Sequence, residues 1–382
     1  MQPQQGTCKT DPRSGNAINT GGIGQRDDVA LTHALFHCHE CLRAPWMRWL
    51  VALECDLVVN SPEGLYCPAG DFHIDPWRPV PRAVITHGHG DHARGGMGCY
   101  HVVDAGLPIL QWRLGEQDYR VHAHGEQFRL GDATVSFHPA GHVLGSTQVR
   151  IEVEGQTWVL SGDFKRDPDP TCLPFEVVPC DVFVTEATFG LPVFRWPSAS
   201  DVARDIASWR DECAASGESA ILYCYALGKA QRVLAELMAH TDRPAWLHGA
   251  IDAGVQVYRA AGVPMLQTRR VADEARGADF PGELIIAPPS AAGSAWTRRF
   301  RNAQQGFASG WMRIRGNRRR RNFDRGFVVS DHADWPSLLR TVHETGARRI
   351  IATHGDTDAL VRVLRESGID AGVFQTSYGE DD

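Results

Sequence analysis

Long apolar runs are missing from this sequence. No uninterrupted stretch approaches the roughly 20 residues that a helix needs to cross a lipid bilayer. The polar N-terminal residues also lack the charged segment followed by an apolar one that marks a secretory signal. We therefore expect neither membrane insertion nor secretion.

Cysteine is scarce and irregularly spaced, with ten residues scattered over 382. Disulfide frameworks stabilise small secreted domains, whereas this chain is 43% hydrophobic and long enough to form a large core, in one domain or two. We therefore interpret the cysteines as reduced thiols and expect a cytoplasmic protein.

An excess of positive charge is also missing. The 39 lysine and arginine residues are outnumbered by 46 aspartate and glutamate residues, which gives a net charge of −7. Proteins that bind phosphate backbones usually carry a basic surface, so the net charge alone argues against a nucleic-acid partner. The distribution of charge does not, because residues 298–325 contain many arginines and a single acid, Asp324.

Aromatic residues accompany these arginines: Trp296, Phe300, Phe307, Trp311 and Phe323. Arginine binds phosphate bidentately and aromatic rings stack on unpaired bases, so the segment predicts a track for a single strand. We expect its densest run to bind substrate: Arg318, Arg319, Arg320 and Arg321. A solvated charge run is the alternative for the arginines, and a place in the core is the alternative for the aromatic residues.

Residues 86–92, with the sequence THGHGDH, follow the apolar run 83–85 and predict a metal site. They supply four potential ligands: His87, His89, Asp91 and His92. Imidazole nitrogen and carboxylate oxygen suit zinc, and manganese or iron could occupy the same ligands. The consecutive residues Asp91 and His92 cannot point the same way in a regular strand or helix. The spacing therefore predicts two adjacent metal ions, and a polar loop is the alternative.

Three further ligand candidates each follow a β-rich run: His142, Asp163 and His354. Such repetition is typical of an α/β sheet that carries its site at the strand ends. Other histidines lack carboxylates at ligand spacing, and we interpret them as surface residues: His73, His101, His122 and His124.

The 86–92 motif, followed in order by His142, Asp163 and His354, resembles the metallo-β-lactamase fold. Residues 184–190, 226–231 and 329–334 resemble the additional motifs of its β-CASP branch, whose members cleave nucleic acids.

Residues 64–79 and 307–312 are similar to the bacterial ligase-associated DNA damage response exonucleases, which are related to mRNA 3′-end processing factors. The resemblance extends from about Leu57 to near the C-terminus. It implies an α/β protein, namely an αββα sandwich with an inserted α/β cap.

The pattern along the chain fits this division. Residues 1–46 are polar and without periodicity, so we expect a disordered leader, with Met47 as a possible start. Short β-like runs and turns follow, and helical spacing begins after Pro197. We expect the first part of the metallo-β-lactamase domain at 47–191, the cap at 192–325 and the completing part at 326–382.

The resemblance also implies a role for each site residue. One zinc ion would be held by His87, His89 and His142. The other would be held by Asp91, His92 and His354, and Asp163 would bridge the two. Asp75 would orient the ligands through hydrogen bonds.

Proton transfer and substrate binding are assigned in the same way. His332 would protonate the leaving sugar oxygen, and the neighbouring Glu186 would raise the pKa of His332 and fix its tautomer. Lys229 would hold a phosphate together with backbone amides at the start of a helix.

The expected function is that of a metal-dependent nuclease, most simply a DNA exonuclease that works in DNA repair with a DNA ligase. His354 favours an RNA nuclease of the mRNA 3′-end processing type instead, because RNA-cleaving members of the family carry histidine at this motif. Two further functions stay open: a non-catalytic nucleic-acid-binding subunit and a small-molecule hydrolase of the same fold.

Overall fold

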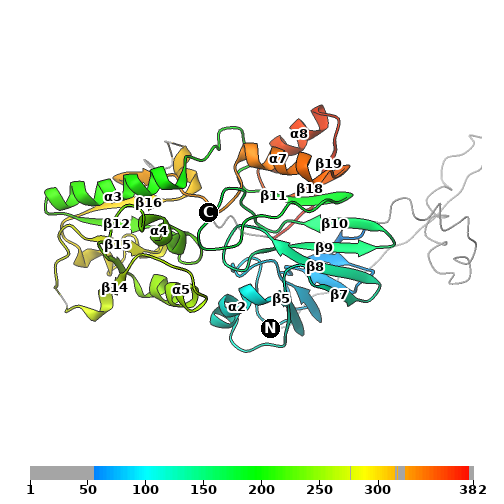
Figure 1. Cartoon of the computed structure of the whole chain (residues 1–382), viewed down its shortest axis with the longest axis horizontal. Coiled ribbons are helices and arrows are strands. Elements are labelled where there is room, and N and C mark those ends of the chain that lie inside the picture. The colour runs from blue at the N-terminus through cyan, green and yellow to red at the C-terminus, as the bar shows by residue number, and fades with distance from the viewer. Residues whose placement is uncertain (1–55, 276, 315, 317–322, 378–382) are drawn as a thin grey trace, which may run out of the picture. The chain divides into compact units, whose positions relative to one another are not determined.

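The computed structural model describes residues 56–275, 277–314, 316 and 323–377 (Figure 1). The expected leader at 1–46 and the candidate start Met47 lie outside the described residues. The same holds for the run predicted to bind substrate: Arg318, Arg319, Arg320 and Arg321.

The first two sheets of the described residues are built mainly from the chain before residue 188. The first sheet joins its strands in chain order: β1 (Val59–Asn60), β2 (Leu65–Cys67), β3 (Phe72–Ile74), β4 (Arg82–Val84), β5 (Cys99–Val103) and β6 (Tyr119–His122). The second sheet has the order β19 (Asp370–Val373), β18 (Arg349–Gly355), β11 (Val182–Ala187), β10 (Gln156–Leu160), β9 (Thr147–Val153), β8 (Ala133–Pro139) and β7 (Gln127–Leu130).

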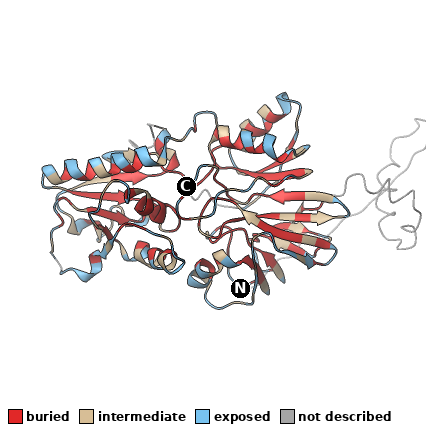
Figure 2. Ribbon diagram, in the orientation of Figure 1, coloured by how far each residue is buried: buried red, intermediate tan, exposed pale blue. Residues whose placement is uncertain are grey.

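These two sheets pack face to face. Phe72 and Val84 of the first sheet share one apolar cluster with Phe137, Ile151 and Trp158 of the second, and all five side chains are buried. Figure 2 shows buried residues concentrated along the strands, while the helices expose their outer faces. Burial of this shared apolar surface is the main force that holds the two sheets together.

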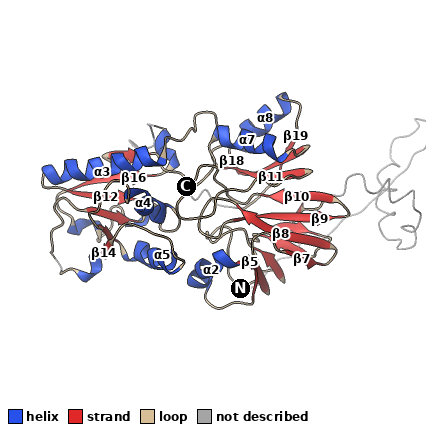
Figure 3. Ribbon diagram, in the orientation of Figure 1, coloured by secondary structure: helices blue, strands red, loops and turns tan. Residues whose placement is uncertain are grey.

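Helices cover the outer faces of both sheets (Figure 3). α2 (Leu107–Leu114) packs Leu110 onto Tyr100 of the first sheet, and α7 (Trp335–Thr345) and α8 (Thr357–Glu366) pack onto Ile350 of the second. The start of α7 is fixed by Asp334, whose carboxylate accepts a hydrogen bond from the Ser337 amide (3.0 Å), as an N-cap residue does. The layers therefore follow the order helix, sheet, sheet, helix.

The third sheet lies in the chain between β11 and α7, and its strands are parallel. Its order is β14 (Thr268–Arg270), β13 (Ala245–Leu247), β15 (Leu284–Ala287), β12 (Ser219–Tyr223), β16 (Ala303–Ala308) and β17 (Arg325–Phe327). Three helices pack on one face: α3 (Ala199–Ala215), α4 (Lys229–Leu237) and α5 (Gly249–Ala260). Short 3₁₀ helices complete the described elements: η3 (Asp104–Gly106), η4 (Val271–Asp273), η5 (Pro289–Ala291), η6 (Thr297–Arg299) and η7 (Gly310–Arg313).

The fold class predicted from the sequence, an αββα sandwich with an inserted α/β sheet, is confirmed. β10, β11 and β18 are adjacent and parallel, so their carboxyl ends lie at one edge of the second sheet. The loop after β4 approaches the same edge, where the Thr147 amide donates to the Thr86 carbonyl (2.9 Å). Among the described residues, no helix has the length and apolar character of a membrane span.

Candidate metal centre and proton donor

The predicted ligands converge at this edge of the sandwich. His87, His89, His142 and Asp163 bring their ligand atoms within 4.8 Å of one another, and so do His92, Asp163 and His354. Asp163 belongs to both groups. The structure therefore brings together side chains from residues 86–92 and from three distant positions, as expected from the strand ends.

The first group has the spacing of a metal shell. Nδ1 of His89 lies 3.1 Å from Nε2 of His87 and 3.1 Å from Nε2 of His142. Oδ2 of Asp163 lies 3.5 Å from His87 Nε2 and 3.7 Å from His142 Nε2. Atoms bound to one tetrahedral zinc at about 2.0–2.2 Å lie roughly 3.3–3.6 Å apart, so one ion would fit among these four atoms.

Hydrogen bonds on the far side of each ring show which nitrogens carry protons. His142 Nδ1 lies 2.9 Å from the Asp331 carbonyl oxygen and His89 Nε2 lies 3.3 Å from that of Leu227. A carbonyl only accepts, so these nitrogens must carry the N–H, and a neutral ring has just one. Burial lowers the pKa of both rings, which favours the neutral form.

The protonated nitrogen of His87 is assigned in the same way. The Thr86 hydroxyl donates to Asp75, so its oxygen accepts from His87 Nδ1 (3.0 Å), and burial lowers the pKa of His87 as well. The three nitrogens that face one another therefore all present lone pairs. Lone pairs at 3.1 Å repel each other, and a cation between them removes the repulsion; the donor set thus fits a metal ion.

A glycine aims one of these carbonyls. Gly228 has a φ of +86°, which glycine adopts at no steric cost, and a Cβ there would lie 2.5 Å from a methyl group of Val143. This turn lets the preceding Leu227 carbonyl face His89.

The second group surrounds His92 with carboxylates. His92 Nδ1 lies 2.7 Å from Asp75, while Nε2 lies 3.5 Å from Asp91 and 3.5 Å from Asp163. Although burial opposes protonation, these carboxylates raise the pKa of His92 to about 10. The local field therefore favours positive charge, which a divalent cation would supply. His354 completes the group with Nε2 at 2.9 Å from Asp163 Oδ1.

Asp163 lies at the centre. Burial alone would raise the pKa of its carboxyl group, but His92 and His354 hold that pKa well below its usual value. One oxygen faces the rings of the first group and His92, and the other faces His354. This is the placement that a bridging carboxylate needs.

Asp75 does not face the ligand atoms but orients the ligands by hydrogen bonds. Besides His92, its carboxylate accepts from the Thr86 amide (2.8 Å) and the Thr86 hydroxyl. Asp75 therefore contacts His92 of the second group directly and His87 of the first group through the Thr86 hydroxyl.

His332 and Glu186 form a buried pair beside the ligands. His332 Nδ1 lies 2.8 Å from Glu186 Oε2, and both side chains have atoms close to Asp163. Burial opposes protonation of His332, yet Glu186 raises the pKa of this ring above its ordinary value. Glu186 is itself held by the Phe164 amide (2.7 Å) and the Thr188 hydroxyl (2.6 Å).

A cavity of about 150 Å³ adjoins the centre. It is lined by His89, Tyr225, Ala226, Leu227, Lys229, Asp331 and His332. Lys229 is the first residue of α4, is 1% exposed, and lies 3.6 Å from the Asp331 carboxylate. Its ammonium also lies 4.8 Å from the ring centre of Tyr225. Burial lowers the pKa of Lys229.

Outside the metal centre, the structure bears on the predictions for the aromatic residues and for the surface histidines. Of the five aromatic residues near the arginine segment, Phe307 is buried in the core of the third sheet and the other four pack against it. The structure therefore supports a place in the core for them. The surface interpretation was wrong for His101, which is 7% exposed, whereas His122, which lies 3.1 Å from it, is partly exposed.

The sequence did not point to Tyr225, to the carbonyls of Leu227 and Asp331, or to Trp196, whose indole contacts the His332 loop. Every residue has a carbonyl, so no residue type signals such a role. Only the place of Leu227 within the 226–231 motif, and that of Tyr225 directly before it, could have drawn attention to them.

Comparisons with known proteins show several relatives of the chain. No family model matches the chain. The chain is 30% identical over 320 residues to a probable DNA ligase of Opitutus terrae, covering 82% of this chain and 30% of that protein. An RNase J-like protein of Methanocaldococcus jannaschii is 23% identical over 249 residues, which cover 57% of each chain. The cleavage and polyadenylation specificity factor 73 of Drosophila melanogaster is 33% identical over 215 residues, 50% of this chain and 29% of that protein.

The chain thus spans from less than a third to little more than half of the length of these relatives. A solved structure of a protein of unknown function from Enterococcus faecalis has a TM-score of 0.52 at 12% identity, covering 78% of this chain and 80% of that one, a likeness of fold alone. With the motifs and the layers described above, these relatives show that the chain belongs to the β-CASP branch of the metallo-β-lactamase fold.

Proposed function

We propose that the chain is a metal-dependent nuclease that hydrolyses phosphodiester bonds with two zinc ions. The observation that carries the proposal is the pair of ligand groups that share Asp163, with the His332–Glu186 pair in contact with the shared residue. A small-molecule hydrolase of this fold would need the ligands, but it would not need a proton donor matched to a sugar alkoxide.

Zinc ions held by the two groups would lower the pKa of a water molecule and neutralise charge on the phosphate. In the hydrolysis, a P–O bond to the water oxygen forms while that water releases a proton to solvent, and the P–O bond to one sugar breaks. The leaving sugar oxygen takes a proton from His332 Nε2, because Nδ1 is engaged with Glu186. Solvent then returns a proton to the ring.

The ionic partner makes His332 suitable for this step. Glu186 raises the pKa of His332, which favours the protonated ring, and its hydrogen bond to Nδ1 leaves Nε2 facing away from the carboxylate. Asp75 supports the ligands from behind, as hydrogen-bonded carboxylates do in other zinc sites.

We assign the substrate as DNA and the activity as an exonuclease of DNA repair that works with a DNA ligase. The similarity of most of the chain to part of a probable DNA ligase supports this choice. An RNA nuclease is the second candidate, because His354 completes the metal centre and two relatives are an RNase J-like protein and a cleavage and polyadenylation specificity factor. The full set of ligands argues against a non-catalytic subunit.

We further propose that residues 192–325 act as a cap over the domain formed by 47–191 and 326–382. Tyr225, Leu227 and Lys229 of this segment line the cavity beside His89 and His332. A base or sugar could contact this wall while the adjoining phosphate faces the metal centre. Arg318, Arg319, Arg320 and Arg321 belong to the same segment, and we propose that they bind the substrate, although they lie outside the described residues.

The test uses purified, metal-analysed protein and end-labelled single- and double-stranded DNA and RNA of matched sequence. We expect ladders from DNA and none from the same protein after chelation, with activity restored by zinc. Ladders from RNA alone would move the assignment to the second candidate. Absence of cleavage of all four by zinc-loaded protein would refute the nuclease assignment.

A further inference from the structure

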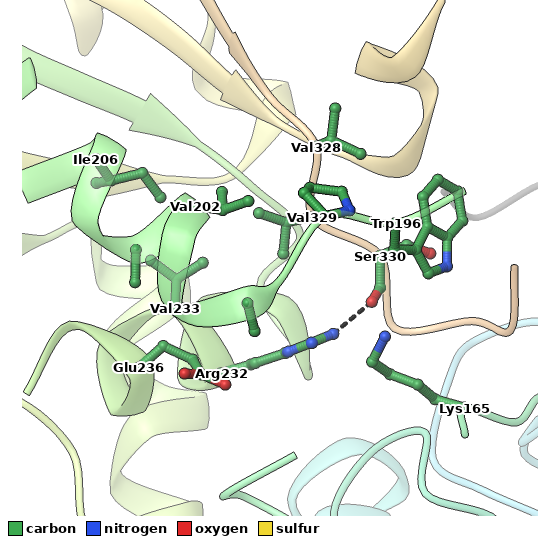
Figure 4. A pocket seen from close by; sticks show the side chains of 13 residues that line it. Lys165, Trp196, Val202, Ile206, Arg232, Val233, Glu236, Val328, Val329 and Ser330 are labelled. Carbon is green, nitrogen blue, oxygen red and sulfur yellow. Dashed lines mark hydrogen bonds between the residues drawn. The ribbon is translucent and has the colours of Figure 1, made fainter. Parts of the chain in front are cut away.

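Three consecutive carbonyls of the His332 loop accept hydrogen bonds from side chains of three different segments. Arg232 donates to Ser330, His142 Nδ1 to Asp331 (2.9 Å), and Trp196 Nε1 to His332 (2.9 Å). Figure 4 shows Arg232 extended toward Ser330, with Trp196 on the other side of the backbone segment that carries Ser330. The backbone that carries the proposed proton donor is thus held on both sides.

Trp196 is itself anchored. It belongs to the connection between β11 and α3, and its amide donates to the Asp334 carboxylate (3.1 Å), which also caps α7. Its ring packs edge to face on Phe189 at 4.8 Å between centroids. The indole N–H therefore has little freedom to leave the His332 carbonyl.

Arg232 is fixed by charge. It lies in α4, is 4% exposed, and has guanidinium nitrogens 3.4 Å from Asp169 and 3.6 Å from Asp331. A buried guanidinium without carboxylates would be costly, so these two partners hold it in place. Asp169 belongs to the loop after the metal ligand Asp163. Arg232 thus connects the helix of the third sheet to both catalytic loops.

A proton donor acts only within hydrogen-bond reach of the leaving oxygen, and a displacement of about 1 Å can cost about 10²-fold in rate. Glu186 fixes one ring nitrogen of His332, but the position of the ring also depends on the backbone that carries it. We infer that Trp196 and Arg232 are positioning residues that place His332 for proton donation. The inference rests on the proposed function and adds to it that the cap sets the place of the donor.

Two substrates with different leaving groups distinguish a positioning role from a general loss of folded structure. The leaving group in DNA is a sugar alkoxide, which needs a proton. The leaving group in bis(p-nitrophenyl) phosphate is a phenolate, which needs none. For Trp196→Phe, which keeps an aromatic ring but loses the N–H donor and one ring of the indole, we expect kcat on DNA to fall roughly 10- to 100-fold. We expect turnover of bis(p-nitrophenyl) phosphate and zinc content to stay within a few-fold of the unmodified protein.

Three further variants complete the experiment. Arg232→Lys keeps the buried charge and loses the fork of donors, and we expect the same selective loss on DNA. Trp112→Phe, in the exposed part of α2, is the matched control and should change neither substrate. His332→Ala is the reference for complete loss of the donor.

The outcomes are distinguishable. If Trp196→Phe and Arg232→Lys lost equal activity on both substrates, or none on either, the positioning role would be overturned. A selective loss of activity on DNA in His332→Ala would then still uphold His332 as the donor. A His332→Ala variant that lost both activities equally would instead refute the assigned donor, and the positioning role with it.

Discussion

His101 gives a prediction whose size follows from the structure. Its ring is buried in β5, stacks on His122 at 5.3 Å between centroids, and shares a 3.1 Å hydrogen bond with it. Burial, then the neighbouring His122 and Arg120, lower the pKa of His101 from 6.5 to about 4. His101 is therefore neutral in the folded chain under conditions where it is charged in the unfolded chain.

The sign follows from proton uptake. Between pH 6.5 and 4 the unfolded state binds more protons at this position, so stability is present above pH 6.5 and is lost as the pH falls. One pKa unit corresponds to about 1.36 kcal/mol, which gives a loss of about 2 kcal/mol between pH 7 and pH 5. The loss approaches about 3.4 kcal/mol below pH 4.

The perturbation is His101→Phe, measured by urea unfolding at pH 7, 6 and 5 at constant ionic strength. The difference in unfolding free energy between parent and variant should fall by about 2 kcal/mol from pH 7 to pH 5, because histidines distant from position 101 titrate in both proteins and cancel. At pH 7 the variant should be less stable by about 1 kcal/mol for the lost hydrogen bond. His343→Gln, on the exposed side of α7, serves as the control. A difference independent of pH would refute the reasoning.

Three predictions concern the metal centre and the cavity. Asp163→Ala should lose both metal and nuclease activity, since the shared carboxylate is removed, and an active, zinc-replete variant would contradict its role; the exposed Asp205→Ala is the control. Asp75→Asn should weaken zinc binding about 10- to 100-fold in a chelator competition, because the His92 partner loses its charge, and asparagine tolerates the φ of +44° found there. Tyr225→Ala should raise KM on nucleic acid roughly 5- to 150-fold at unchanged zinc content if the ring stacks on a base, and Tyr225→Phe should not.

The convergence of the ligands could be expected from the sequence because of strand geometry. Asp163 follows β10 and His354 lies at the end of β18, and both strands run parallel to β11, which lies between them. Parallel strands present their carboxyl ends at one edge of the sheet. The 86–92 motif supplied the remaining residues as a single loop. Residue type and strand order together were enough to place these side chains near one another.

The buried state of His101 could not be read in the same way. β5 is parallel to both of its neighbours and is buried on both faces, so its residues show no alternation of polar and apolar types. The burial of Lys229 has a similar cause, since a lysine at the start of a helix usually faces solvent and only the tertiary partner Asp331 shows otherwise. In both cases packing overrides the ordinary preference of the residue.

The carbonyl groups that accept from the ligand rings indicate that the cap also acts on the metal centre. The N–H of His89 faces Leu227, whose carbonyl is aimed by the turn before α4, so this part of the cap fixes which nitrogen of the ring is offered to a metal. Arg232, near the start of the same helix, acts on the His332 loop. Changes at the turn that aims the Leu227 carbonyl should therefore register in zinc affinity and changes at Arg232 in kcat on DNA, whereas changes in an arginine track should register in KM and in its dependence on salt.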